Sequence, residues 1–288
     1  MVGWIDTILQ GVLLGGLYCL YATGLSVIFG IMRLVNLAHG DLIVLGAYLM
    51  LAVTIIGVPL VLAFIVVVPL MFAIGYALQS VLLNRALGRN ILPPLLITFG
   101  LSIIVQNGLL ETFSADTRFL SVGPLQSASL PLGSGIAVGI MPLVCLVAAI
   151  AVIVLLNSVF YRTSLGRAFR ATSDDVEIAQ LMGINNKSIY ALTMGLALAV
   201  CAVAAFFLGT RANFDPSIGP ARLLYAFEAV IIGGLGSLWG TLAGGIVVGL
   251  AQTIGAHIDP EWQILSGHIA FLIVLVIRPR GLFPRAVD

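Results

Sequence analysis

The chain has 288 residues, of which 60% are hydrophobic and only 9% are charged, and its formal net charge is +1. Soluble domains carry about 25% charged residues, so this composition, with a mean hydropathy of +1.16, excludes an ordinary soluble protein. The sequence predicts an all-α polytopic membrane protein, because it lacks the short alternating segments of a membrane β-barrel. The nearly balanced charge gives no reason to expect a nucleic-acid partner.

Eight apolar segments are candidates to cross a bilayer as helices. They are residues 5–31, 42–56, 59–83, 91–113, 137–156, 189–208, 241–257 and 262–277. A shorter segment, 223–238, is interrupted by glycines and lies between the sixth and seventh. The N-terminal stretch has no basic region and no cleavage site, so we expect a retained helix. Residues 1–288 are therefore predicted to form one transmembrane domain of about eight spanning helices plus one short or broken crossing.

The distribution of basic residues predicts which side of the membrane each loop occupies. If segment 223–238 crosses, one side carries ten of the 13 basic residues, namely Arg33, Arg85, Arg89, Arg162, Arg167, Arg170, Lys187, Arg278, Arg280 and Arg285. The other side then carries three, Arg118, Arg211 and Arg222. If the segment does not cross, the division is seven against six. The stronger bias favours a crossing, with the N-terminus outside and the C-terminus in the cytoplasm.

The longest polar stretch lies at residues 158–188, between the fifth and sixth spanning segments. Thr172 followed by Asp175 is similar to a capping box and predicts that a short helix starts there. Gly183, with the two asparagines that follow, predicts its end. We therefore expect a helix over roughly 174–182 outside the membrane.

One side of this expected helix carries Val176, Ala179 and Gly183 at spacings of three and four residues. Such a narrow face of small residues suits close approach by a partner protein. A plain solvated loop between two helices is the alternative interpretation.

Two breaks interrupt the apolar pattern, and the first is residues 33–41. It contains Asn36, His39, Gly40 and Asp41 near the predicted inner boundary. Irregular backbone at membrane depth is tolerated only where it is buried in protein or lines a cavity. We therefore expect these four residues to line or gate a pathway.

The second break, residues 226–240, holds Glu228 followed by Gly233, Gly234 and Gly236. Ionisable residues inside membranes are costly and usually functional, so Glu228 is a pathway candidate. The alternative is a structural carboxylate that pairs with a neighbour such as Arg222 or Asn213. The glycines have a packing alternative as well, since GxxxG pairs beginning at Gly11, Gly240 and Gly245 are typical of closely packed membrane helices.

No pattern in the sequence indicates an enzyme or a metal site. Cys19, Cys145 and Cys201 lie in apolar segments and are interpreted as small core residues. His257 and His268 lie near helix ends, where we expect interfacial positions. The glycines of GGLGSLWG lack the Lys-Ser/Thr of a phosphate-binding loop, so no ATP site and no cofactor are expected in this chain. The scarcity of intramembrane charges indicates that energy for any transport arrives from elsewhere.

Four stretches together resemble LivH-type permeases of branched-chain amino-acid ABC importers. GLYCLYATGLSVIFGIMRLVNLAHGDLIVLGAYL is similar to the family's opening and GRAFRATSDDVEIAQLMGIN to its coupling loop. FEAVIIGGLGSLWGTLAGGIVVGLAQ and RPRGLFP resemble its last third. The match covers nearly the whole chain in the family's order. It departs at residues 34–37, where the family often has Ile-Asn-Phe, and at Trp239, where proline is frequent.

The resemblance implies a multi-pass permease subunit in a bacterial or archaeal cell membrane, surrounded by lipid. Its expected partners are a LivM-like second permease or a second copy, two cytoplasmic ATPase subunits that bind ATP and Mg²⁺, and an external binding protein. It implies ATPase-coupling roles for Gly166, Arg167, Arg170, Ala171, Asp175, Val176, Ala179, Gly183 and Ile184. Branched-chain amino acids are the expected substrates, with urea, short amides or other amino acids as alternatives. A stand-alone channel or secondary carrier is the competing class.

Overall fold

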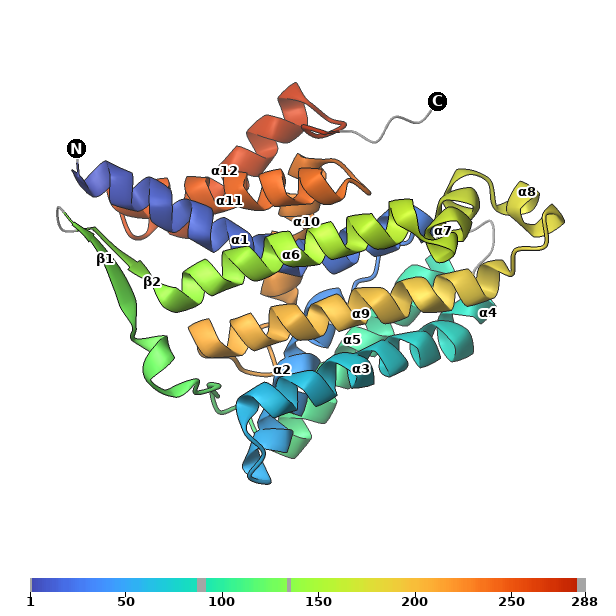
Figure 1. The fold of residues 1–288 in the computed structure, drawn as a ribbon, viewed down its shortest axis with the longest axis horizontal. Helices are drawn as coiled ribbons and strands as arrows, with labels where there is room; N and C mark the ends of the chain where they lie inside the picture. The colour runs from blue at the N-terminus through green and yellow to red at the C-terminus, as the bar shows by residue number, and fades with distance from the viewer. Residues whose placement is uncertain (1, 87–91, 134–135, 284–288) are drawn as a thin grey trace.

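A computed structural model describes residues 2–86, 92–133 and 136–283. Figure 1 shows long helices lying alongside one another, with one small hairpin at the end that also holds the N-terminus. In chain order the elements are α1 (Val2–Met32), α2 (His39–Ile55), α3 (Leu60–Leu78), η1 (Gln79–Leu83), α4 (Asn84–Ala86), α5 (Leu92–Phe113), η2 (Gly123–Gln126), β1 (Ser129–Gly133), β2 (Ile136–Gly139), α6 (Ile140–Arg162), α7 (Ser164–Asp174), α8 (Val176–Leu181), α9 (Asn186–Arg211), α10 (Gly219–Gly233), α11 (Leu238–Ile258) and α12 (Trp262–Ile277). Arg89, Ile91 and Arg285, used in the expectations above, lie outside the described residues.

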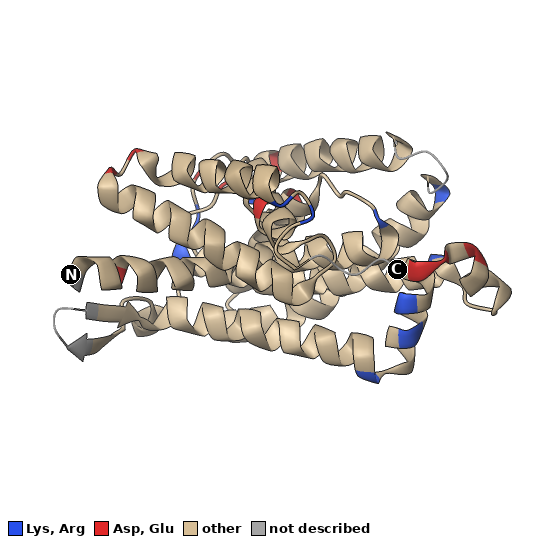
Figure 2. Cartoon of the chain, turned by 90° about the horizontal axis from the view of Figure 1, so that it is seen from above, with Lys and Arg blue, Asp and Glu red and all other residues tan. Residues whose placement is uncertain are grey.

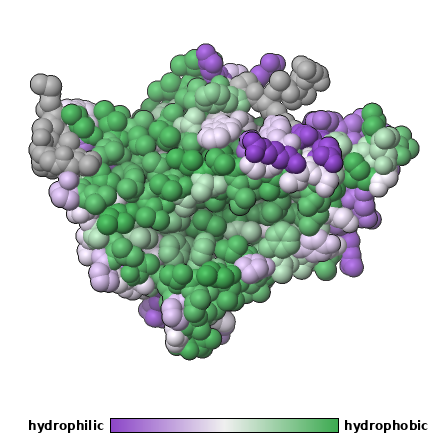
Figure 3. All heavy atoms as spheres, in the orientation of Figure 1, coloured by the Kyte–Doolittle hydropathy of each residue, from purple (hydrophilic) through white to green (hydrophobic). Residues whose placement is uncertain are grey.

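The helices confirm an all-α polytopic membrane protein. Within the described ranges, six stretches are long and apolar enough to cross a membrane: α1, α3 continued through α4, α5, α6, α9 and α11. Helices α2 and α12 are apolar but shorter, with 17 and 16 residues, and α10 has 15. Large apolar side chains remain exposed along α3, α5, α6 and α12. Figure 3 shows that the face seen in Figure 1 is broadly apolar, as a lipid-facing surface requires.

The fifth predicted segment starts later than expected, because residues 136–139 form a strand. β1 and β2 pair antiparallel, with Leu130 opposite Val138 and Pro131 opposite Ala137, and the register shifts between Pro131 and Gly133. The expectation of a helix from Ala137 was therefore wrong. The apolar run before α6 is too short to show a helical period, so its pattern did not separate a strand from a first helical turn.

Helix α1 lies at the centre of the bundle and packs along α11 through glycines. A Cβ atom on Gly15 would lie 2.5 Å from Ile246 Cα, and one on Gly249 would lie 2.4 Å from the Gly11 carbonyl oxygen. The two backbones are thus in direct contact. This is the packing role that the GxxxG spacing favours.

Two short helices begin inside the protein instead of at its surface. After α1 the chain folds back through the buried residues Leu34 and Asn36, and α2 starts at buried His39. After α9 the chain folds back through buried Phe214, and α10 starts at buried Gly219. At about 1.5 Å per residue, α10 is shorter than the roughly 30 Å apolar thickness of a bilayer. The first predicted break, residues 33–41, therefore leads into the buried start of α2. The second, residues 226–240, covers the last part of α10 and the turn into α11, so the irregular entry to α10 at residues 212–218 was not predicted.

Candidate functional site

The polar stretch after α6 forms two helices where a single one over 174–182 was expected. Thr163 caps α7, since its Oγ1 accepts the N–H of Gly166 at 3.0 Å. A Cβ on Gly166 would lie 2.2 Å from the Phe160 carbonyl oxygen, so only glycine fits at this bend. Thr172, the expected start of the helix, is buried inside α7 and donates to Asn186 Oδ1 at 3.2 Å.

Helix α8 begins at a different cap. The Asp175 carboxylate accepts the N–H groups of Glu177 at 2.8 Å and Ile178 at 2.9 Å. The helix stops at Gly183, which has a φ of +83°, and the N–H of Ile184 returns to the Ala179 carbonyl at 3.0 Å. The expected helix over roughly 174–182 and its stop at Gly183 are therefore confirmed. The expected cap at Thr172 was wrong, since Asp175 caps α8 and a separate helix, α7, precedes it.

The exposed side of α8 differs from the expected one. Of the expected Val176/Ala179/Gly183 face, Ala179 is 2% exposed and packs on the rest of the chain, whereas Val176 and Gly183 are exposed. Three large apolar side chains project instead: Ile178, Leu181 and Met182 are 59%, 86% and 78% exposed. We call these three residues the α8 tip. The small-residue face is therefore divided, because Ala179 is used to pack α8 on its own chain.

Hydrogen bonds fasten this segment to the long helices. Ser173 donates to the Gly30 carbonyl at 2.6 Å, which ties α7 to α1. Asn186 at the start of α9 donates to the Val176 carbonyl at 2.7 Å. These bonds connect α7 to α1 and α8 to α9.

The other residues expected in this segment differ in exposure. Arg170 is half-buried, donates to the Phe160 carbonyl and lies over the Tyr161 ring at 5.1 Å. Arg167, Asp175, Val176 and Gly183 are exposed, Ala171 and Ile184 are half-buried, and Gly166 is buried. Figure 2 shows basic residues gathered at the α7 end of the molecule, away from the N-terminus.

The first break is held by buried polar contacts. The Asn36 side-chain oxygen accepts the N–H of Ala38 at 3.1 Å, and its carbonyl accepts the N–H of His39 at 3.2 Å. His39 Nε2 donates to the Tyr21 carbonyl at 2.8 Å, and its ring lies 3.7 Å from Cys201 Sγ. His39 thus joins α2 to α1 and α9. Both side chains are buried within the chain.

Asp41, two residues further along α2, joins the two half-helices to α5. Its carboxylate accepts from Ser102 at 2.5 Å and from Gln106 at 2.9 Å. A Cβ on Gly40 would lie 2.0 Å from the Gly219 carbonyl oxygen, and a Cβ on Gly219 would lie 1.9 Å from Asp41 Oδ1. The first turns of α2 and α10 therefore touch backbone to backbone beside a buried carboxylate.

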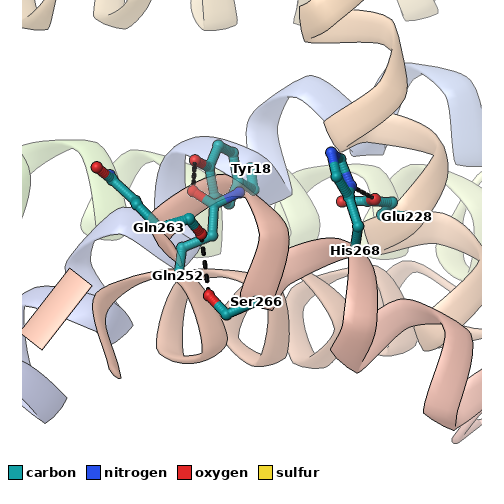
Figure 4. Close-up of polar contacts among 6 residues, drawn as sticks. All are labelled: Tyr18, Glu228, Gln252, Gln263, Ser266 and His268. Carbon is teal, nitrogen blue, oxygen red and sulfur yellow. Dashed lines mark hydrogen bonds and ion pairs between the residues drawn. The ribbon is translucent and has the colours of Figure 1, made fainter. Parts of the chain in front are cut away.

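Glu228 on α10 pairs with His268 on α12, as Figure 4 shows. The expectation that His268 lies at the membrane interface was wrong. The alternative that Glu228 pairs with a neighbouring helix is confirmed, although the partner is His268 and not the suggested Arg222 or Asn213. Arg222 lies instead over the Tyr225 ring at 5.9 Å. Glu228 Oε2 is buried and has no hydrogen-bond partner among the described residues. The isolated histidine in the apolar run 262–277 was the signal that sequence reasoning did not use.

The glycines of the second break shape the turn between α10 and α11. Gly234 and Gly236 have φ values of +105° and +79°, and a Cβ on Gly233 would lie 2.2 Å from the Gly240 carbonyl oxygen. The chain after α12 pairs with this turn, because the N–H of Phe283 donates to the Gly233 carbonyl at 3.0 Å. These contacts favour the packing interpretation of the three glycines. Among the described residues no group of three His, Cys, Asp or Glu side chains is placed to hold a metal ion.

The chain is similar to known transport proteins over nearly its whole length. The family described as "Branched-chain amino acid transport system / permease component" matches residues 7–277. The high-affinity branched-chain amino acid transport system permease protein BraD of Pseudomonas aeruginosa is 30% identical over 297 residues, which cover 98% of this chain and 96% of that protein. LivH of Escherichia coli K12, described in the same words, is 28% identical over 299 residues, with coverage of 98% and 96%.

A solved structure is similar in fold. It is described as PsaBC from Streptococcus pneumoniae in complex with Fab, and it superposes with a TM-score of 0.52 at 16% identity, covering 98% of both chains. At this identity the likeness concerns the fold alone. The match of the family to residues 7–277 and the 30% identity to BraD lead to one conclusion. The chain belongs to the family of permease components of branched-chain amino acid transport systems.

Proposed function

We propose that this chain is the membrane-spanning permease subunit of an ABC importer that translocates branched-chain amino acids across the cell inner membrane. The observation that carries the proposal is the family match over residues 7–277, together with a polytopic bundle of the same extent. The family is a transport component and not an enzyme. ATP and Mg²⁺ are bound by two cytoplasmic ATPase subunits, and an external binding protein delivers the substrate.

The α8 tip is the contact that receives motion from an ATPase subunit. Its three apolar side chains are exposed at the end of a short helix, which suits insertion into a groove on a partner. The hydrogen bonds from Ser173 to α1 and from Asn186 to α8 give that motion a path into the bundle. Arg167, Asp175 and Val176 flank the tip, and Gly166 and Gly183 form its bends.

The moving part inside the membrane is the junction of the two half-helices. Discontinuous helices that meet near the membrane centre are the usual elements of transport pathways. At this junction Gly40 and Gly219 touch, Asp41 is bonded to α5, and Glu228 is bonded to α12. We assign gating roles to Asn36, His39, Asp41 and Glu228, because each joins a half-helix or its entrance to a neighbouring element. A LivM-like second permease, or a second copy of this chain, forms the other wall of the pathway.

Substrate competition tests the substrate class. Cells that take up labelled leucine through this chain and its partner subunits should lose that uptake when valine or isoleucine is added in excess. Urea and short amides should not compete. Competition by urea with no effect of valine would contradict the proposal.

The proposed topology has nine crossings, with α2 and α10 each completing one and with the N-terminus outside. Val287→Cys should react with a membrane-impermeant thiol reagent only from the cytoplasmic side, and Ser127→Cys only from outside. The native cysteines should add little labelling of their own, because Cys19, Cys145 and Cys201 are all buried. Labelling of both new cysteines from one side would contradict the topology and the crossing through α10.

The Glu228–His268 pair should have a measurable coupling energy. His268→Leu leaves a buried carboxylate without either hydrogen bond and should cost about 2 kcal/mol of stability. Glu228→Leu should cost less, since half-exposed His268 then turns to other partners. The double variant should be more stable than the sum of the two by about 1–2 kcal/mol. Thermal unfolding of the purified chain in detergent measures all three, and additive effects would show that the pair is not coupled.

A further inference from the structure

A cavity of about 310 Å³ opens between α1, α6, α7 and the turn that leads into α11. The lining residues that matter for its chemistry are Ser26, Phe160, Tyr161, Phe169, Arg170 and Trp239. The cavity lies at the end of the bundle that carries the basic residues of α6 and α7. It is separate from the half-helix junction, because none of the residues at that junction lines it.

The electrostatic character of this cavity is positive. Arg170 is the charged side chain among the described residues that line it, and no acidic side chain stands beside it in the lining. One guanidinium nitrogen donates to the Phe160 carbonyl and the group rests on the Tyr161 ring, so its position is fixed before any ligand arrives. A guanidinium has five N–H donors and suits the oxygens of a phosphate.

A second observation points to a polar ligand group in the same cavity. Ser26 lines the cavity, is 1% exposed, and its Oγ has no hydrogen-bond partner among the described residues. A buried hydroxyl without a partner costs free energy that a ligand oxygen would recover. Arg170 and Ser26 therefore offer donors from two sides of one cavity.

The surface that continues from the cavity is apolar. On α6, Val147, Ile150 and Val154 are exposed at helical spacing on the stripe that ends at Tyr161. Trp239 is 48% exposed at the cavity mouth, and tryptophan and tyrosine are enriched where a membrane meets water. Figure 3 shows this face as a broad apolar surface with polar residues gathered toward the α7 end.

We propose that this cavity binds the headgroup of an anionic phospholipid, with its phosphate on Arg170 and its acyl chains along the apolar stripe of α6. Basic pockets between membrane helices on the cytoplasmic side recognise such headgroups. The lipid contacts Phe169 and Arg170 on α7, one element before the α8 tip, so it lies where it stiffens the connection between that tip and α1. The proposal depends on the membrane embedding of the chain and not on which substrate it carries.

Quenching of Trp239 by brominated lipids tests the proposal. The chain has three tryptophans, so Trp4→Phe and Trp262→Phe leave Trp239 as the only reporter in the full-length protein. In vesicles of phosphatidylcholine, brominated phosphatidylglycerol should quench Trp239 with a relative association constant about fivefold above that of brominated phosphatidylcholine. Arg170→Gln should reduce this ratio to about one. The matched control Arg167→Gln, on the same helix and outside the cavity lining, should keep it.

A second variant leaves the charge unchanged. Ser26→Val removes the Ser26 hydroxyl from the cavity wall and fills its place with a methyl group. This variant should also lower the preference for phosphatidylglycerol. Equal quenching by the two lipids in the single-tryptophan protein would overturn the proposal. An equal loss of preference in Arg167→Gln and Arg170→Gln would overturn it as well, since only general surface charge would then matter. Absence of quenching by either lipid would overturn the proposal too, because no lipid would then lie beside Trp239.

Discussion

Replacing Leu181 by aspartate is expected to reduce the amount of ATPase subunit that co-purifies with the chain by about 30-fold. Leu181 is 86% exposed at the α8 tip, where the proposed partner groove would bury it. A central apolar contact of an interface is worth about 2 kcal/mol or more, and about 1.4 kcal/mol corresponds to a factor of ten. Pull-down from membranes that contain the whole importer, with the ATPase quantified per permease, measures the effect.

The matched control is Leu181→Met, which keeps an apolar side chain of similar volume and should retain the ATPase. Gly183→Trp would be a poorer test, because the φ of +83° strains any residue other than glycine there. Normal recovery of the ATPase with Leu181→Asp, at normal permease levels, would show that the tip is not the docking contact.

Replacing Gly219 by valine should remove most of the folded protein. A Cβ at this position would lie 1.9 Å from Asp41 Oδ1 and 2.9 Å from Asp41 Cα, so the backbones of α2 and α10 would have to separate. Overpacking against backbone costs about 3 kcal/mol when neither side gives way, and the bonds from Asp41 to Ser102 and Gln106 would be disturbed too. The yield of monodisperse protein and its midpoint of thermal unfolding measure the loss.

Gly100→Val provides the control for this substitution. Gly100 lies in α5, and a Cβ there would meet no atom within 4 Å, so its yield should stay close to that of the natural chain. Similar yields for the Gly100 and Gly219 variants would contradict the close crossing of the half-helices.

The lengths of the apolar segments predicted most of the helices in the bundle. Residues 262–277 form α12 with the expected bounds, and the ends of α5 and α11 lie within a few residues of their predicted ends. The hairpin of β1 and β2 was missed, because a four-residue apolar strand beside a long apolar helix has no period of its own. The depth at which α2 and α10 begin was also beyond sequence reasoning. It depends on the contact of Gly40 with Gly219, which are far apart in the chain.

The sequence predicted which residues belong to the candidate site, but it did not predict which residues they contact. Asn36, His39 and Asp41 were singled out as ionisable or polar groups in a membrane segment, and all three are buried. Their partners come from distant elements, so no spacing pattern could reveal them. In α8, the spacing of Val176 and Ala179 identified one face of the helix, but it did not predict whether that face points toward the protein or toward solvent. That direction is decided by the bonds of Thr172 and Asn186 that fix the segment to α9.

The central claim is that this chain carries branched-chain amino acids only as part of an ATP-driven assembly. Vesicles reconstituted with the chain, its ATPase subunits, a second permease and the binding protein allow a direct measurement of labelled leucine uptake. Uptake should require ATP on the ATPase side and should fall to background when the ATPase subunits are omitted. Leucine uptake by the chain alone at the same rate without ATP would contradict the account and identify a channel or secondary carrier.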